Sequence, residues 1–133
     1  MAPWGVSQDE PLPNAPEIHD NLDGLQFIQN ETCEAIWKAS DPQKTRYNLS
    51  YKPLPGTITG TIYNDGVAIQ QFASHNDGSM ALMSIKGSVA KVRGAMVVHA
   101  TSQIIFEWEG VPGTSDHIVV SYESSLQTCP SVV

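Results

Sequence analysis

The stretch TITGTIYNDGVAIQQFASHNDG, residues 57–78, contains two apolar segments, each followed by a turn sequence. Asn64-Asp65-Gly66 separates the two segments, and Asn76-Asp77-Gly78 ends the second. Asn, Asp and Gly tolerate the positive φ angles that a tight hairpin requires, so each turn sequence predicts a β-hairpin. Short β-rich segments separated by turn residues continue over residues 45–123, with almost nothing typical of a helix. The sequence therefore predicts an all-β fold.

Eight or nine strands are expected. Alternating apolar and polar residues over 45–52 are typical of a half-buried strand, and Asp41-Pro42 is expected to turn the chain before it. Gly94 is expected either as a turn between two strands or as a β-bulge in one long bent strand. The candidate strands are 33–39, 45–52, 57–63, 67–73, 80–85, 88–93, 95–100, 104–109 and 118–123. They predict a single antiparallel β-barrel, calycin-like, or a closely related β-sandwich.

The N-terminal region differs from the rest of the chain. Residues 1–20 contain four prolines and no regular apolar period, which predicts an extended or disordered leader. Residues 21–30 are expected to form a short helical turn, because apolar residues follow one another at spacings of three from Leu22 to Ile28. With 133 residues in total, residues 21–133 are expected to form a single β domain.

Several of the later strands carry apolar residues on both faces. Met80 and Leu82 are expected on one face of their strand, and Ala81 and Met83 on the other. A sandwich needs only one apolar face on each sheet. The second face is then expected to be covered by residues 21–30 or by another subunit. We predict a homodimer, and a two-sided core within one chain is the alternative.

The charge of the chain restricts its partners. The 14 acidic and 7 basic residues give a net charge of −7, which repels nucleic-acid phosphates, so no nucleic-acid partner is expected. No apolar run approaches the roughly 18 to 20 residues of a membrane span, so no membrane partner is expected. The chain starts without a signal peptide, which predicts either a cytoplasmic protein or a secreted one whose signal has been removed.

The sequence contains no cofactor fingerprint. It has neither a glycine-rich phosphate loop nor a G-x-S-x-G elbow, and its four histidines show no metal-binding spacing. Neither a cofactor nor a metal ion is therefore expected.

The two cysteines, Cys33 and Cys129, lie at the start of the first candidate strand and just after the last. The first and last strands of a closed or two-layered β fold often lie side by side, so the two residues are candidates for a disulfide. Such a bridge would close a long loop and stabilise the fold by roughly 4 kcal/mol in the entropic view. Two unpaired thiols in a reducing cytosol are the alternative, and both interpretations stay open.

Two short segments resemble known families. The expected helical turn, followed by a strand bearing Trp37, resembles the start of a calycin, the lipocalin-type barrel, with Ala35 in place of that family's glycine. The segment GTITGTIYN, residues 56–64, is similar to the opening strand of avidins. Each resemblance covers a few residues and assigns no family.

The segment 104–109 carries the strongest candidate for chemistry. Ile104 and Phe106 share one face with Trp108, whereas Glu107 lies on the other face. In the simpler interpretation the aromatic face is core and Glu107 is in water. In a small barrel, by contrast, Glu107 would line a cavity where loss of water raises its pKa towards the range useful for proton transfer. His99 is its expected catalytic partner, although a histidine on an apolar face is more often a core residue.

A ligand pocket in such a barrel would need aromatic walls and hydroxyl donors, which suit an apolar or polycyclic molecule. The residues expected to provide them are Trp37, Tyr51, Tyr63, Trp108 and Tyr122.

Two functions follow from these patterns. The first is the binding of a small hydrophobic molecule in an aromatic-lined cavity, with or without cofactor-free acid/base chemistry such as cyclisation or isomerisation. The second is a secreted recognition protein, an effector or lectin-like module, that acts through its surface loops. An enclosed cavity with a buried His or Glu would favour the first function, and a solid core with an exposed aromatic platform would favour the second.

Overall fold

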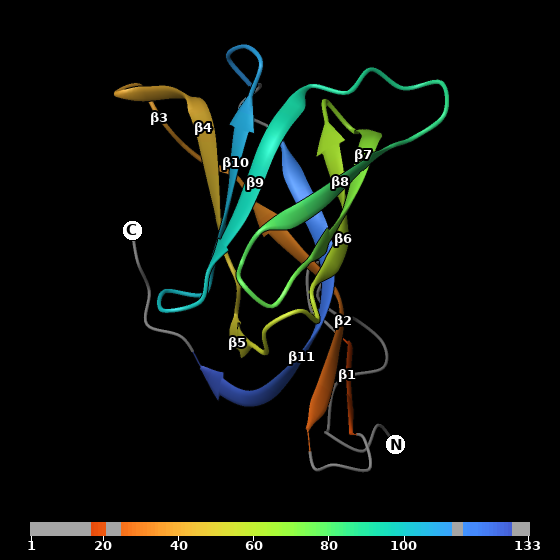
Figure 1. The fold of residues 1–133 in the computed structure, drawn as a ribbon, viewed down its shortest axis with the longest axis vertical. Helices are drawn as coiled ribbons and strands as arrows, with labels where there is room; N and C mark the ends of the chain where they lie inside the picture. Colours follow the sequence, from red (N-terminus) through yellow and green to blue (C-terminus); the bar gives the residue numbers. More distant parts are fainter. Residues whose placement is uncertain (1–16, 21–24, 113–115, 129–133) are drawn as a thin grey trace, which may run out of the picture.

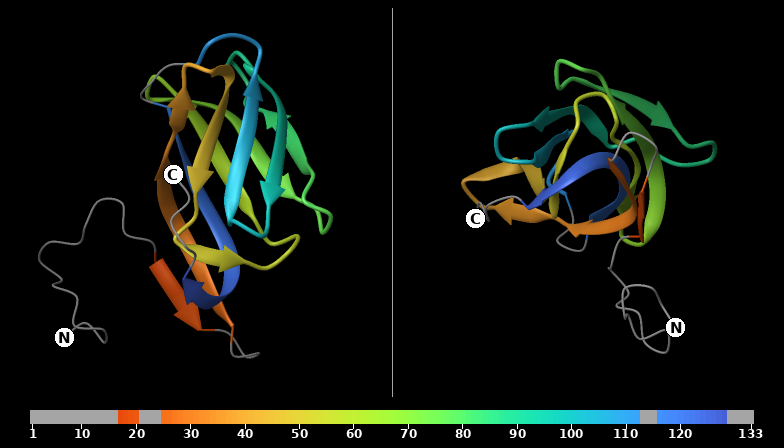
Figure 2. Two further views of the ribbon diagram at one scale, coloured as in Figure 1. Left: turned by 90° about the vertical axis from the view of Figure 1, so that its left-hand side faces the viewer. Right: turned by 90° about the horizontal axis from the view of Figure 1, so that it is seen from below.

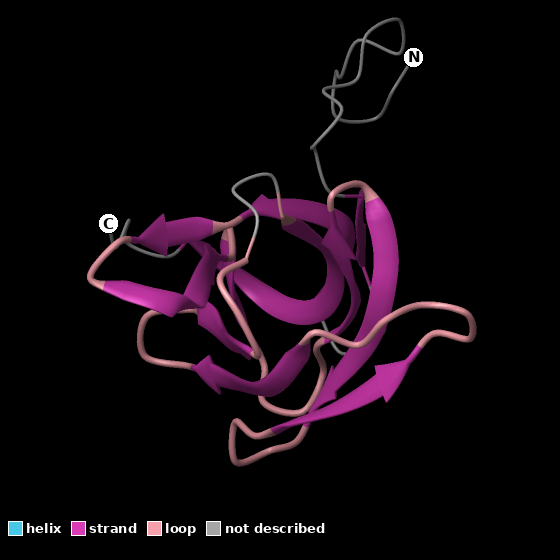
Figure 3. Ribbon diagram, turned by 90° about the horizontal axis from the view of Figure 1, so that it is seen from above, coloured by secondary structure: helices cyan, strands magenta, loops and turns pink. Residues whose placement is uncertain are grey.

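The computed structural model describes residues 17–20, 25–112 and 116–128 (Figure 1). These residues form eleven strands and, within them, no helix (Figure 3). Nowhere in the described ranges is there a helix long and apolar enough to cross a membrane. The strands form two antiparallel sheets, packed as a β-sandwich (Figure 2). The predicted all-β fold is confirmed, whereas the expected number of eight or nine strands is wrong, since the described residues alone form eleven.

The larger sheet has the strand order β1-β2-β11-β6-β7-β8, and β5 pairs with β11 outside this order. Its strands are β1 (Glu17–Asp20), β2 (Gln26–Glu34), β5 (Tyr51–Pro53), β6 (Thr59–Asn64), β7 (Val67–Ser74), β8 (Met80–Ser84) and β11 (His117–Thr128). The smaller sheet has the order β3-β4-β10-β9. Its strands are β3 (Ile36–Lys38), β4 (Asp41–Asn48), β9 (Val92–Val98) and β10 (Gln103–Trp108).

The two sheets are connected on both sides, but the described residues do not close them into a barrel. On one side the chain passes from β2 to β3 through Ala35, whose N–H donates to the carbonyl of Asp116 at 3.1 Å. On the other side Ser79, the residue before β8, forms one isolated bridge with Met96 of β9. Beyond this bridge β8 and β9 are not paired, and residues 85–91, which connect them, belong to no strand. The calycin-like barrel is therefore not found, and the alternative, a β-sandwich, is confirmed.

The space between the sheets is filled by side chains. The largest of them are all less than 2% exposed: Trp108, Tyr47, Tyr122, Phe72 and Phe106. The centroid of the Phe106 ring lies 5.1 Å from that of Tyr47 and 5.4 Å from that of Phe72, so the aromatic contacts cross from the smaller sheet to the larger. The apolar face predicted for the Trp108 strand is confirmed as core.

A buried polar cluster joins β2, β11 and the residue before β5. Glu31 is 2% exposed; its Oε1 accepts from the Tyr122 hydroxyl at 2.6 Å, and its Oε2 accepts from the Ser50 N–H at 2.8 Å. The Cys33 thiol donates to the same Oε2 at 3.3 Å, and burial, together with the Glu31 carboxylate, raises the pKa of Cys33. These donors offset the cost of burying a carboxylate, so Tyr122 has a structural role.

The helical turn expected over residues 21–30 is not formed where the chain is described. Residues 26–30 belong to β2, while residues 21–24 lie outside the described residues. Within β2, Ile28 is paired on one side with Ile18 and on the other with Tyr122. Pairing with two neighbouring strands therefore overrides the local spacing of apolar residues.

Three other local predictions concern turns and strands. The turn predicted at Asp41-Pro42 is wrong, because both residues lie in β4 and the chain turns at Ala39 and Ser40. The strand expected over 88–93 is also wrong, since only its last two residues are extended, as the start of β9. Gly94 lies inside β9 where the register against β10 shifts, so the β-bulge interpretation is confirmed.

The expected leader and the expected disulfide are described only in part. Residues 17–20 form β1, while residues 1–16 lie outside the described residues. Cys129, the expected partner of Cys33, lies outside them as well. The disulfide therefore stays a prediction, as does the homodimer.

Gly60 in β6 is paired with Phe72 in β7, and a Cβ atom at Gly60 would lie 2.5 Å from Phe72 Cζ and 2.6 Å from the Val119 carbonyl oxygen. We predict that Gly60→Ala lowers the free energy of unfolding by about 1–3 kcal/mol, because the ring and the neighbouring backbone must both move. Urea unfolding measures this change.

Gly110→Ala is the matched control for that substitution. A Cβ atom at Gly110 meets nothing within 4 Å, so we expect a change below about 0.5 kcal/mol. Equal losses in the two variants would show that the close approach at Gly60 does not constrain the fold.

Candidate functional site

Glu107, the expected catalytic carboxylate, lies on the outer face of the smaller sheet. Its side chain is 42% exposed and forms an ion pair with Arg93 at 3.1 Å. With residues such as Arg46 and Met96, it lines a surface groove of about 200 Å³. This position agrees with the simpler interpretation, in which the Glu107 carboxylate is in water.

His99 lies in the turn between β9 and β10, away from Glu107. Glu107 is paired with Gly94 in the first half of β9, whereas His99 follows the last residue of that strand. The Nε2 atom of His99 is buried and has no hydrogen-bond partner among the described residues. The structure therefore does not bring the expected acid/base pair together.

The five aromatic residues expected around a ligand lie in several different places. Trp108 is in the core, where its indole N–H donates to Thr45 Oγ1 at 2.8 Å. Tyr122 is also in the core, and its hydroxyl accepts from the Tyr51 N–H at 3.2 Å, so these two tyrosines do meet. Tyr63 stacks on His117, with ring centroids 4.7 Å apart. Most of these rings therefore fill or border the sandwich instead of lining one cavity.

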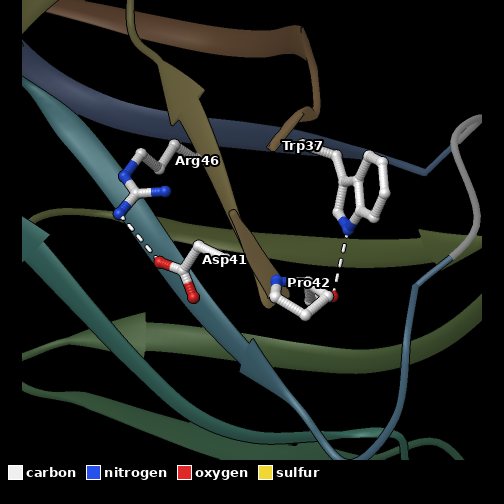
Figure 4. Close-up of polar contacts among 4 residues, drawn as sticks. All are labelled: Trp37, Asp41, Pro42 and Arg46. Atoms are coloured by element: carbon white, nitrogen blue, oxygen red, sulfur yellow. Dashed lines mark hydrogen bonds and ion pairs between the residues drawn. The ribbon is translucent and has the colours of Figure 1, made fainter. Parts of the chain in front are cut away.

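Trp37 is the remaining aromatic candidate, and it contacts its own hairpin. Its indole N–H donates to the carbonyl of Pro42 at 3.0 Å across the β3–β4 turn (Figure 4). The same hairpin holds an ion pair at 3.2 Å between Arg46 and Asp41. The Trp37 side chain therefore stabilises the hairpin.

A pocket with a more suitable set of groups lies where three connecting segments meet. These segments are the β6–β7 turn, the residue before β9 and the loop after β10, and they lie at one end of the sandwich (Figures 1 and 2). We call it the loop-end pocket. Its volume is about 470 Å³, and its lining residues are Asn64, Asp65, Lys91, Trp108, Gly110, Val111 and Pro112.

A chain of hydrogen bonds leads from this pocket into the protein. The Lys91 ammonium donates to Asn64 Oδ1 at 3.0 Å, and Asn64 Nδ2 donates to Asp116 Oδ1 at 2.7 Å. Because the two ends of the Asn64 amide bind groups of opposite charge, its orientation is determined. The pocket thus holds an ammonium group whose position is set by buried neighbours.

Asp116 is the buried end of this chain, only 1% exposed. Its second carboxylate oxygen, Oδ2, has no hydrogen-bond partner among the described residues. Burial raises the pKa of Asp116, while hydrogen bonds from Asn64 and from the Asp65 backbone act in the opposite direction. A buried carboxylate with one oxygen that lacks a partner among the described residues lowers the stability of the fold, and groups of this kind are typical of functional sites.

Gln70 of β7 holds the backbone at Lys91. This buried side chain accepts from the N–H groups of Val92 and Lys91, at 2.9 and 3.1 Å, and donates to the carbonyl of Val92 at 2.9 Å. On the other side, the Glu109 N–H donates to the carbonyl of Lys91 at 2.9 Å. Lys91 is thus fixed by both sheets.

The groups in the loop-end pocket suit binding. An ammonium, a carboxylate and an amide provide donors and acceptors, and Val111, 68% exposed, provides apolar surface. In the described part of the chain, no group of three His, Cys, Asp or Glu side chains is placed to hold a metal ion.

Of the residues that line this pocket, only Trp108 was expected from the sequence to bind a ligand. Asn64 and Asp65 were interpreted as turn formers, which they are, and Lys91 and Asp116 carry no motif. One signal was present in Gln70, a polar residue at a position where the alternation of β7 places a buried side chain.

Comparisons of the chain with models of protein families, with curated proteins and with solved structures gave no match.

Gln70→Met should lower the free energy of unfolding by more than about 2 kcal/mol. The variant keeps the approximate volume of the side chain but leaves the buried backbone groups of Val92 without partners, at about 1–3 kcal/mol for each. The neighbouring substitution Gln71→Met, on the exposed side of β7, is the matched control and should change little. Equal effects of the two substitutions in urea unfolding would show that the Gln70 amide is not needed.

The raised pKa of Asp116 predicts a dependence of stability on pH. The folded protein keeps this proton to a higher pH than the unfolded chain, where the ordinary value is about 3.8. The contribution of Asp116 to stability is therefore present at low pH and falls as the pH rises through the raised pKa. Asp116→Asn cannot ionise at this position, so it does not lose this contribution. Its free energy of unfolding minus that of the unmodified protein should therefore increase as the pH rises from about 3.8 through the raised pKa of Asp116.

Unfolding experiments at a series of pH values measure that difference. Glu109→Gln removes one negative charge from an exposed position nearby and controls for the change in net charge. If the difference in free energy of unfolding between Asp116→Asn and the unmodified protein does not vary with pH, the pKa of Asp116 is the same in the folded and unfolded chains and the prediction is wrong.

Proposed function

We propose that this protein is a recognition module that binds a small ligand in the loop-end pocket. The observation that carries the proposal is the hydrogen-bonded chain from Lys91 through Asn64 to the buried Asp116. Polar groups held in place before the ligand arrives reduce the entropy lost on binding. The proposal corresponds to the second of the two functions expected from the sequence, recognition through surface loops.

The packing of the interior favours this function over the binding of a polycyclic molecule inside the fold. Such binding requires free space between the sheets, where Trp108, Tyr47 and Phe106 are packed instead. The acid/base hypothesis has less support for a related reason, since Glu107 is paired with Arg93 at the surface and is separated from His99.

The position of the pocket also supports a binding role. Loops carried by a rigid sheet scaffold are a common place for binding residues. Here the scaffold reaches into the pocket, because Gln70 and Glu109 hold the backbone of Lys91 from the two sheets. The ammonium group consequently loses little further freedom when it binds a ligand.

Nuclear magnetic resonance with a library of small neutral and charged fragments tests the proposal. We expect the amide shifts that respond to fragments to cluster at Asn64, Lys91, Gly110 and Val111. Val111→Trp should remove these responses, because the indole fills the pocket. Met96→Trp is the matched control, since Met96 is also an exposed apolar residue but lies on the outer face of the smaller sheet.

The proposal makes a clear negative prediction as well. Fragments should not cluster on the outer-face groove of about 330 Å³ near Thr61 and Met83, or on the groove near Met96. Responses confined to those grooves, or responses at the loop-end pocket that Val111→Trp leaves intact, would contradict it.

A further inference from the structure

The charges around the loop-end pocket disfavour ionic ligands of either sign. A cation would approach the Lys91 ammonium, and the amide oxygen of Asn64, a natural cation ligand, already accepts from that ammonium. An anion would approach two carboxylates, Asp65 in the wall and Asp116 behind Asn64, in a protein of net charge −7. A ligand of either sign therefore meets a like charge in or beside the pocket, and this repulsion favours a neutral ligand.

The hydrogen-bonding groups of the pocket suit hydroxyl groups. An ammonium has three N–H donors, of which Lys91 directs one to Asn64. The Asp65 carboxylate accepts and does not donate. A hydroxyl group can both accept and donate, so the hydroxyls of one ligand can pair with Lys91 and with Asp65, which line the same pocket.

The remaining wall of the pocket is apolar and open. Val111 is 68% exposed, and beside it Gly110 has no side chain and nothing within 4 Å of the place where a Cβ would lie. This wall offers a surface for the C–H face of a ring. The volume of about 470 Å³ lies within the range of roughly 300–1,000 Å³ found for ligand pockets.

From these three properties we infer that the loop-end pocket binds a neutral, polyhydroxylated ligand, a saccharide without charged groups. Its hydroxyls bind Lys91 and Asp65, and the apolar face of its ring packs against Val111 and Gly110. The inference rests on the proposed function, since it names the ligand class of the same site.

A glycan array and isothermal titration calorimetry with the full chain test the inference. The array contains neutral, sulfated or carboxylated, and amino-bearing glycans, and the neutral glycan that binds best is then titrated. We expect binding to neutral glycans, with an affinity that does not change with salt concentration because no ligand charge is involved.

Four substitutions test whether the glycan occupies the loop-end pocket. Lys91→Met and Asp65→Asn should each weaken binding by about tenfold or more, because each removes a charged hydrogen-bond partner. Lys52→Met and Asp77→Asn make the same chemical changes outside the pocket and should leave the affinity unchanged. Unfolding curves of all four variants show whether a loss of binding is a loss of the fold.

The outcomes separate this inference from the proposed function. If charged glycans or charged fragments bind at the loop-end pocket and neutral glycans do not, the ligand class is wrong and the recognition site stands. If neutral glycans bind but Lys91→Met and Asp65→Asn have no effect, the assigned groups are wrong. If neither fragments nor glycans perturb the pocket, both the inference and the proposed function fail.

Discussion

The side chain of Gln70 provides an interaction on which much of the structure depends. At the point where β8 and β9 separate, its amide makes the two hydrogen bonds to Val92 that a neighbouring strand would otherwise make. Buried backbone N–H and C=O groups must be paired, so the open edge of the sandwich needs a side chain that replaces the missing neighbouring strand. The same amide also binds the backbone of Lys91, and the edge of the fold thereby sets the position of the pocket.

Two buried carboxylates show how this protein uses polar groups in different ways. Glu31 has donors for both oxygens, from Tyr122, Ser50 and Cys33, and its cluster joins strands. Asp116 has a donor from Asn64 at one oxygen, whereas its other oxygen has none among the described residues. A satisfied cluster stabilises a fold, whereas an incompletely satisfied buried group costs stability, and such a group marks a candidate functional site.

Several features were predictable because they depend on neighbours in the sequence. Asp65 and Gly66 have positive φ angles of 52° and 81°, as their turn sequence predicted. The apolar face around Trp108 was likewise predictable from alternation. The role of Glu107 was not, because alternation assigns it to the face opposite Trp108 but does not say whether that face lies in a cavity or in water.

The sequence by itself determined the all-β class, the hairpin turn at Asp65 and Gly66 and the apolar face around Trp108, since each of these follows from residues close together along the chain. Tertiary structure alone decided that the sheets form a sandwich, because closure depends on how far β8 and β9 stay paired. It also decided the pocket. Asn64 lies 27 positions from Lys91 and 52 positions from Asp116 along the chain. Only the packing of three loops on two sheets brings the ammonium, the amide and the buried carboxylate into one hydrogen-bonded chain.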